Sequence, residues 1–500
     1  MDHDASGHST NRRAIESFKL LITASEAFPA FERLFLNAEV EIWAGFRIFD
    51  LSTRLRSEEA QQIGKTWLDL FVHTLERGVS ITLVLSDFDP VVATEQHRNS
   101  WESARKLASA GEIAGRGTLT FRVAAHPARV GILPRLVLRG KVREKLKEAD
   151  AGPMTPGLDG VSGGDIFDLI PATHHQKLAV FDRTTLYIGG LDLDERRYDT
   201  PGHERPAAET WQDVQAIVTG PVVEAAQTHL ETFEVVTEAK AAPEPRHDGF
   251  IRTLSQKRRV APFHISPKTV VREIEALHLE AIGRSSKLIY LETQFLRHLP
   301  IAECLAARAD EVPGLHLIAV LPAAPEAIAF DGETGKDVRM GEHLQAKSVA
   351  TICEAFGDRA LICAPVQRRR TRQTRDRSAF NGAPIVYVHS KVSIFDEVEA
   401  TVSSANLNGR SMCWDTEAGV HLTDQAHISH LRERLFRHWM PEVGDGGTLD
   451  ADKLVSAWRA AIQRNAKAAP DRRSSFLVPY DDEVAREFGE GVPIVPDELV

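Results

Sequence analysis

The chain has 500 residues, of which 43% are hydrophobic and 26% are charged, so it has the composition of an ordinary soluble globular protein and not of a disordered or fibrous one. Its formal net charge of −11 argues against nucleic acid as a partner, because a polyphosphate favours a basic surface. The length exceeds what one hydrophobic core usually serves, so we expect two domains of about 200 residues each.

The N-terminus, MDHDASGHSTNRRA, is polar and lacks the apolar core of a secretory signal. The chain has no run of about 18 apolar residues, which argues against a transmembrane helix. We therefore expect a cytoplasmic protein, at most peripheral to a membrane, with export without a leader as the open alternative. The cysteines, Cys304, Cys353, Cys363 and Cys413, form no C-x-x-C pair, which predicts packing residues or free thiols.

Strands alternate with helical stretches in the first half of the chain. Residues 1–37 are expected to be an N-terminal segment and residues 38–240 a first domain. Within this domain, VEIWAGFRIF (40–49) and VSITLVLSDFDP (79–90) read as strands on either side of a helical stretch. An insertion over 127–170 interrupts the pattern. Such alternation indicates an α/β domain.

The insertion begins with a basic helical stretch, RVGILPRLVLRGKVREKLK (129–147). Its basic residues are Arg129, Arg135, Arg139, Lys141, Arg143, Lys145 and Lys147, set against one acid, Glu144, and interspersed with Ile132, Leu133, Leu136, Val137 and Leu138. Basic side chains are attracted to an anionic leaflet and an apolar face can enter the interface. We expect a membrane contact here, with a solvated basic surface as the alternative.

An eight-residue pattern closes the first half and returns in the second. HQKLAVFD (175–182) recurs as HSKVSIFD (389–396), and in each copy six residues separate the motif from a small pair, Gly189-Gly190 or Ser403-Ser404. Two copies with the same downstream spacing are hard to obtain by chance. The economical reading is a duplicated α/β domain.

The second half repeats the order of the first after an Ala- and Pro-rich linker expected at 241–268. The second domain is expected at 269–440, with strands at KLIYLETQF (287–295) and LHLIAVLPAAPE (315–326). Its basic insertion over 366–383 contains Arg368, Arg369, Arg370, Arg372, Arg375 and Arg377, which we expect to share the entrance of the site with the first insertion. Residues 441–500 are expected to be a C-terminal tail.

Side-chain alternation along a strand places His389 and Lys391 on one face, where a lysine can bind phosphate oxygens while an imidazole attacks phosphorus or carries a proton. Asp396 lies an odd number of residues from both, so it is expected to face away with a structural or orienting role. If the next strand folds back, Ser404 and Asn406 fall opposite His389, where small residues leave room for a phosphate. Gly190 and Asp192 take the same places opposite His175.

The motifs resemble those of the phospholipase D superfamily, whose hallmark is H-x-K-x-x-x-x-D followed after six residues by G-G/S-x-N, present twice. GGLDL within 189–193 and WQDV within 211–214 resemble the eukaryotic-type branch, as does IYLETQF (289–295). The resemblance covers roughly residues 38–440. It implies two α/β/α domains that form a pseudo-twofold pair, with the active site at their interface.

The resemblance also implies the chemistry. One histidine becomes phosphorylated and the other protonates the leaving alcohol, with His175 favoured as the nucleophile and His389 as the acid. The implied catalytic residues are His175, Lys177, Asp182, His389, Lys391 and Asp396; the implied orienting or phosphate-binding residues are Asp192, Asn406, Asp213, Glu417, Gly190 and Ser404. Glu292 and Gln294 are expected to line the pocket. No metal or other cofactor is expected, because lysines and Asn406 can neutralise the phosphoryl charge.

We therefore expect a phospholipase D-type phosphodiesterase that acts on a phospholipid at a membrane surface. An oligomer is not required, because both motifs lie in one chain. A cardiolipin-synthase-like phosphatidyltransferase, a nuclease and a non-catalytic lipid-binding module are the alternatives. The net acidity disfavours the nuclease, and the intact histidines and lysines of both motifs disfavour the non-catalytic module.

Overall fold

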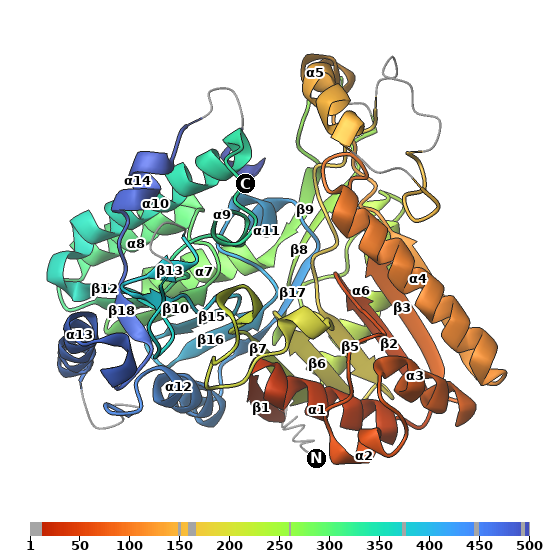
Figure 1. The fold of residues 1–500 in the computed structure, drawn as a ribbon, viewed down its shortest axis with the longest axis horizontal. Coiled ribbons are helices and arrows are strands. Elements are labelled where there is room, and N and C mark those ends of the chain that lie inside the picture. The colour runs from red at the N-terminus through yellow and green to blue at the C-terminus, as the bar shows by residue number, and fades with distance from the viewer. Residues whose placement is uncertain are drawn as a thin grey trace, which may run out of the picture.

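The chain folds into two α/β halves that lie side by side, each built on one large sheet (Figure 1). The computed structural model describes residues 13–148, 152–158, 167–259, 262–372, 377–444, 450–491 and 496–499. Among its described helices, none is both long and apolar enough to cross a membrane.

The first sheet has the strand order β1-β7-β6-β5-β2-β3-β4. Its strands are β1 (Ser17–Ile22), β2 (Glu41–Phe46), β3 (Ser80–Ser86), β4 (Thr118–Ala124), β5 (Leu178–Phe181), β6 (Thr185–Gly189) and β7 (Val214–Thr219). The helices of this half are α1 (Thr23–Asn37), α2 (Glu58–Gln61), α3 (Trp67–Glu76), α4 (Thr94–Ala114), α5 (Ile132–Glu148) and α6 (Val222–Thr237). Strands β2, β3 and β4 pair in parallel, and all other pairs of this sheet are antiparallel.

The second sheet has the strand order β18-β12-β11-β10-β15-β16-β17-β8-β9. Its strands are β8 (Phe250–Gln256), β9 (Lys268–Arg272), β10 (Leu288–Thr293), β11 (His316–Val320), β12 (Ala360–Pro365), β15 (Lys391–Phe395), β16 (Glu399–Ser403), β17 (Glu417–Leu422) and β18 (Leu477–Pro479), and β13 (Ala379–Phe380) and β14 (Ala383–Pro384) form a separate ribbon. The helices of this half are α7 (Glu273–Arg284), α8 (Leu299–Glu311), α9 (Glu326–Ala329), α10 (Lys336–Phe356), α11 (Gly409–Cys413), α12 (Gln425–Trp439), α13 (Ala451–Lys467) and α14 (Glu483–Phe488).

The two sheets repeat one topology, which confirms the expected duplicated α/β fold. In each, three parallel strands (β2, β3, β4 and β10, β11, β12) lead to an antiparallel run (β5, β6, β7 and β15, β16, β17). The run ends on the strand that began the half, β1 in the first sheet and β8 in the second. Each histidine–lysine motif therefore leads into the first antiparallel strand of its own half.

The expected domain boundaries need correction, because the segments outside them belong to the sheets. Residues 1–37 are not a separate segment: β1 pairs with β7, and α1 buries Phe28, Phe31 and Phe35 in the first core. The expected linker at 241–268 contains β8, and the expected tail contains α13 and β18, which pairs with β12. Burial of Trp458 on α13 shows that this segment completes the hydrophobic cluster that lies between the two sheets.

The two halves share one hydrophobic core, which brings their motifs together. Val180 and Ile188 of the first sheet and Val392 and Val402 of the second belong to the same buried cluster. Two parallel bridges, His174 with Thr416 and Gln212 with Val388, connect the segments that precede the motif strands to the opposite half. The motif histidines therefore lie on the boundary between the halves.

Candidate active site

Each motif histidine is fixed at the boundary by the backbone of the opposite half. The amide of His175 donates to the carbonyl of Thr416 at 2.9 Å, and the amide of His389 donates to the carbonyl of Gln212 at 2.7 Å. These contacts are equivalent under exchange of the two halves. A shift of one half against the other would therefore move both imidazoles.

The opposite half also supplies a carboxylate to each imidazole. His175 Nδ1 lies 2.9 Å from Glu417 Oε1, and His389 Nδ1 lies 2.6 Å from Asp213 Oδ2. Both carboxylates are fully buried. A carboxylate on Nδ1 fixes that nitrogen as the proton donor and leaves Nε2 as the reactive atom. Asp213 and Glu417 thus have the positions expected of orienting acids.

Both histidines line one cavity of about 300 Å³ between the halves. Its lining also includes Thr173, Gln294, Asn406, Asn408, Ser411, Asp415, Arg47, Arg197 and Arg410. Asn406 is buried, and its Oδ1 has no hydrogen-bond partner among the residues that the structure describes. The guanidinium groups of this lining suit a phosphate ester. Two carboxylates of the same lining offset part of their charge, since Arg410 pairs with Asp415 at 3.0 Å and Arg197 with Glu326 at 3.6 Å.

Lys177 and Lys391 are buried beside the histidines of their own motifs. Lys177 Nζ donates to the carbonyl of His175 at 2.5 Å, and Lys391 Nζ donates to the carbonyl of His389. Each ammonium is therefore held against the backbone of the histidine two residues before it. Burial lowers the pKa of Lys391 to about 7.

Electrostatics favour neutral imidazoles in the unliganded site. Burial, followed by the charge of Lys177, holds the pKa of His175 well below its usual range; burial and Lys391 do the same for His389. Burial raises the pKa of Asp213 to about 6 and that of Glu417 to about 7. A bound phosphodiester anion would favour protonation of an adjacent imidazole, because opposite charges favour the charged form.

The small residues after each motif make room for the orienting acids. A Cβ on Gly190 would lie 2.2 Å from Asp213 Oδ1, so this position admits only glycine without displacing the carboxylate. The equivalent Ser404 donates its hydroxyl to Glu417 Oε2 at 2.5 Å. These residues support the acids, whereas the sequence predicted that they would leave space for phosphate.

The motif aspartates are structural, which corrects their placement among the catalytic residues. Asp182 accepts from the amides of Glu39, Val40 and Glu41 at 2.8 to 2.9 Å, at the start of β2. Asp396 holds the equivalent turn before β10 through the amides of Ser286, Lys287 and Leu288. Both lie at the far end of their strands from the cavity, in keeping with an odd spacing from histidine and lysine.

Asp192 lies behind the first lysine. Its Oδ1 accepts from the amide of Ile48 at 2.9 Å, and its Oδ2 is 3.9 Å from Lys177 Nζ and 4.0 Å from Arg47. Asp192 is buried and is not among the residues that line the cavity. Asp192 therefore lies where its carboxylate can position Lys177 and Arg47, and it does not face the cavity where a phosphate would bind.

The two residues expected to line the pocket have different environments. Gln294 lines the cavity and donates to the hydroxyl of Tyr387 at 2.7 Å. Glu292 lies behind the cavity, fully buried, and accepts from the hydroxyl of Tyr290 at 2.6 Å and from Trp439 Nε1 at 2.8 Å. Glu292 is therefore part of the packing below the site and not of its lining.

The cavity contains two arginines that sequence reasoning missed. Arg47 follows β2 at the cavity, and its nearest carboxylate oxygen is that of Asp192. Arg197 lies 3.6 Å from the ring centre of Trp211 and is buried, and its Nε and Nη1 have no hydrogen-bond partner among the described residues. Each arginine lowers the pKa of one motif histidine, Arg47 that of His175 and Arg197 that of His389. Both are candidates for contact with a phosphate.

The arginine-rich insertion does not share the entrance with the first insertion. Arg368 Nε donates to the carbonyl of Arg473 at 2.9 Å, Arg370 pairs with Asp471 at 2.8 Å, and Arg377 pairs with Glu342 at 2.5 Å. Arg375 lies outside the described residues. None of the described arginines of this insertion lines the cavity. Arg368 and Arg370 connect the second half to its C-terminal segment, whereas Arg377 pairs with Glu342 of α10.

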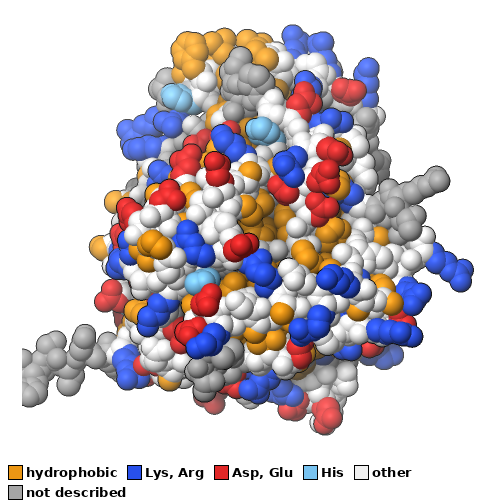
Figure 2. All heavy atoms as spheres, turned by 90° about the vertical axis from the view of Figure 1, so that its left-hand side faces the viewer, with side chains coloured by type: hydrophobic (Ala, Val, Ile, Leu, Met, Phe, Trp, Pro, Cys, Tyr) orange, Lys and Arg blue, Asp and Glu red, His pale blue; other side chains and the backbone are white. Residues whose placement is uncertain are grey.

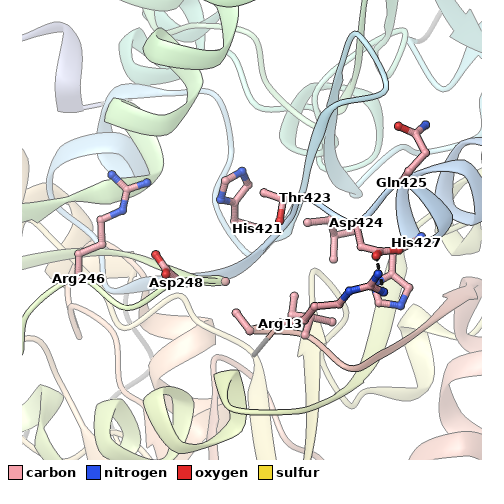
Figure 3. A pocket seen from close by; sticks show the side chains of 12 residues that line it. Arg13, Arg246, Asp248, His421, Thr423, Asp424, Gln425 and His427 are labelled. Carbon is pink, nitrogen blue, oxygen red and sulfur yellow. Dashed lines mark hydrogen bonds and ion pairs between the residues drawn. The ribbon is translucent and has the colours of Figure 1, made fainter. Parts of the chain in front are cut away.

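A larger cavity of about 520 Å³ lies elsewhere, where β17 leads into α12 (Figure 3). Arg13, Arg246, Asp248, His421, Asp424 and His427 line it. Arg13 pairs with Asp424 at 2.6 Å, as the dashed line in Figure 3 marks, and His421 pairs with Glu399 at 3.1 Å. Arg13, Asp424 and His421 of this cavity thus have ion-pair partners within the protein.

The chain is thus a duplicated α/β protein in which the histidines of two equivalent motifs line one cavity. Similarities in sequence to plant phospholipases D and in fold to a phosphatidylserine synthase support a relationship to the phospholipase D superfamily. No family model matches the chain.

The sequence relatives are phospholipases D of plants. Phospholipase D alpha 2 of Brassica oleracea var. capitata is 22% identical, over 52% of this chain and 46% of its own length. Phospholipase D alpha 1 of Cynara cardunculus is 21% identical, over 51% and 46%. The chain thus spans about half the length of the curated relatives it matches. The structure of phosphatidylserine synthase from Haemophilus influenzae Rd KW20 matches the fold with a TM-score of 0.54 and 11% identity, over 91% of this chain and 95% of that one.

Proposed function

We propose that the chain is a phospholipase D-type phosphodiesterase that releases the head group of a glycerophospholipid and leaves phosphatidic acid. The observation that carries the proposal is the pair of imidazoles in one cavity, each held at Nδ1 by a carboxylate of the opposite half. Two oriented nitrogens on one phosphorus can serve as nucleophile and acid. The names of the sequence relatives support a phospholipid as substrate.

In the proposed reaction, His175 Nε2 attacks phosphorus and the bond from phosphorus to the head-group oxygen breaks. His389 Nε2 gives its proton to that oxygen, so the head group leaves as an alcohol. Water then attacks the phosphohistidine, His389 takes a proton from it, and phosphatidic acid departs from a regenerated His175. Glu417 and Asp213 hold the tautomers and stabilise the imidazolium forms.

We assign the charge on the transferring phosphoryl group to Asn406, which lines the cavity, and to Lys177 and Lys391, the ammonium groups buried behind the two histidines. We assign Arg47 and Arg197 to the same task, because both line the cavity beside the histidines. Preorganised cations of this kind act where negative charge develops in the transition state. The resting pKa of His389 is low, and the phosphodiester anion raises it so that the residue holds the proton it must donate.

The test is a head-group release assay across a panel of phospholipids, with His175→Asn and His389→Asn as controls. We expect free head group and phosphatidic acid from at least one phospholipid, with loss of activity in both variants. A phosphatidyltransferase of the cardiolipin-synthase kind would instead require a second alcohol and yield a new phosphodiester. Cleavage of DNA in the absence of lipid hydrolysis would indicate a nuclease. Failure to cleave any phospholipid of the panel would indicate a non-catalytic lipid-binding module.

A further inference from the structure

We propose that α5 and the neighbouring loop at Phe263 form a docking surface for an anionic phospholipid bilayer at the mouth of the catalytic cavity. This inference deepens the proposed function, because it names the element that would present the site to its lipid substrate. Figure 1 shows α5 standing clear of both sheets at one end of the molecule. The helix lies within the insertion that the sequence predicted to contact a membrane.

Large apolar side chains are exposed together at this end. The exposed fractions are 45% for Ile132, 42% for Leu133, 43% for Leu136, 85% for Val137 and 72% for Phe263. On a helix, residues spaced by three, four or five positions share one side, so the four α5 residues form a single apolar strip. The amide of Leu133 donates to the carbonyl of Pro262, which brings Phe263 beside the strip. We call these five residues the apolar strip.

The opposite side of α5 anchors it to the protein. Val142 is buried, and Leu138 and Leu146 are partly buried, in one cluster with Val91 and Leu169. Arg135 adds an ion pair with Asp168. Since this inner side is packed against the protein, α5 is already docked, and the apolar strip remains exposed on its outer side. An apolar surface of this kind marks an interaction site.

The second half of α5 is basic. Lys141, Arg143, Lys145 and Lys147 are exposed there, with Glu144 as the one acid between them. This local excess of positive charge contrasts with the formal net charge of −11 for the whole chain. Figure 2 shows hydrophobic side chains gathered at the end of the molecule where α5 stands, with lysine and arginine side chains beside them. Apolar residues that enter the interface beside cations that meet acidic lipid head groups are the features of a helix bound at an anionic bilayer.

The docking surface lies next to the catalytic cavity. The cluster that anchors α5 includes Val91 and Leu169, and the next residues along the chain, Val92 and Ile170, line the cavity that holds both histidines. Val92 is itself exposed. The segments that anchor α5 thus continue directly into the cavity lining, from which we infer that a bilayer in contact with the apolar strip would lie near the cavity. This proximity to the proposed lipid-cleaving site favours a bilayer as the occupant over a soluble partner or a second copy of the chain.

The test is sedimentation of the full chain with vesicles of phosphatidylcholine alone or mixed with phosphatidylserine, at low and high salt. We expect binding to the mixed vesicles that weakens with salt. Leu136→Ser with Val137→Ser should weaken it by about tenfold or more, because two large apolar side chains no longer enter the interface. Lys141→Gln with Lys145→Gln and Lys147→Gln should weaken it by about a hundredfold, since each of the three cations near an anionic leaflet contributes roughly a factor of five.

Matched controls separate a local effect from a general one. Val398→Ser removes an exposed valine from the turn between β15 and β16, and Lys240→Gln with Lys287→Gln removes exposed cations elsewhere. Both should bind vesicles as the wild type does. All α5 variants should cleave the soluble diester bis(4-nitrophenyl) phosphate at the wild-type rate, which shows that the fold and the site are intact.

Wild type that fails to bind the mixed vesicles, or α5 variants that bind them unchanged, would overturn the docking surface. Concentration-dependent dimerisation that the serine variant abolishes, without vesicle binding, would assign the apolar strip to a second copy of the chain and would overturn it as well. Vesicle binding that depends on α5, without release of any head group, would contradict the proposed function and support the docking surface.

Discussion

Gly190→Ala tests whether the orientation of one imidazole depends on the space beside its acid. The added Cβ would lie 2.2 Å from Asp213 Oδ1 and 3.0 Å from Asp213 Cγ, whereas ordinary van der Waals contact begins at 3.4 Å. The carboxylate must therefore move by about 1 Å, a displacement that can lower a rate by about 10²-fold. Its hydrogen bond to His389 Nδ1, 2.6 Å long, would be lost or bent.

We expect kcat on bis(4-nitrophenyl) phosphate to fall by about 10²- to 10⁴-fold, the upper value corresponding to loss of the correct tautomer. Overpacking should also lower the free energy of unfolding by about 1–3 kcal/mol, measured by denaturant titration. Gly283→Ala on α7 is the matched control, because its Cβ would meet no atom within 4 Å. This control should keep full activity and gain up to about 1 kcal/mol of stability. A Gly190→Ala variant with kcat within about threefold of wild type would refute the orienting role of Asp213.

Three further predictions concern pH, the motif aspartates and metal. The acid limb of kcat/KM against pH should lie near 7, because Glu417 must be ionised to accept from His175 and burial raises its pKa to about 7. Activity should be present above that pH and lost below it. An acid limb near 4 would contradict this role of Glu417. Asp396→Asn should lower the free energy of unfolding by about 1–3 kcal/mol while kcat stays unchanged, since its acceptors bind backbone amides away from the cavity. Activity should survive EDTA, and recovery of lost activity by a divalent ion would contradict the metal-free reaction. Among the described residues, Glu275, His298 and Cys413 could together hold a metal, but the guanidinium of Arg272 already lies there, with its Nη2 3.2 Å from Cys413 Sγ.

The sequence predicted the parts of the site that depend on local geometry. Strand alternation predicted that Asp396 would face away from His389 and Lys391, and Asp396 lies in the turn after β15, where it accepts from backbone amides and does not line the cavity. The internal repeat predicted two equivalent halves, and the halves do repeat one topology. His174, the residue before the first motif, is packed in the interface between the halves, where its Nδ1 lies 2.8 Å from Thr416 Oγ1.

The parts that sequence reasoning missed depend on contacts between distant segments. Arg47 and Arg197 enter the cavity only because β2 and the loop after β6 meet at the boundary, and no spacing in the chain signals this. Glu292 lies on the strand β10, where the pattern YLETQF resembles a strand end, yet the side chains of Tyr290 and Trp439 cover it. Similarly, the sequence does not predict β1 as part of the first sheet, because its partner β7 lies far along the chain, as the pairing of Ser17 with Thr219 shows, and such an edge has no local signature.

The measurement that tests the central claim most directly is the site of phosphorylation during turnover. Wild type and the variants His175→Asn and His389→Asn would be mixed with an activated, labelled phosphodiester, quenched and mapped by mass spectrometry under conditions that preserve phosphohistidine. We predict label on His175, with more of it in His389→Asn, because the imidazole that activates water is then missing, and none in His175→Asn. Label on His389, or turnover by His175→Asn at the wild-type rate, would contradict the assignment of His175 as the nucleophile.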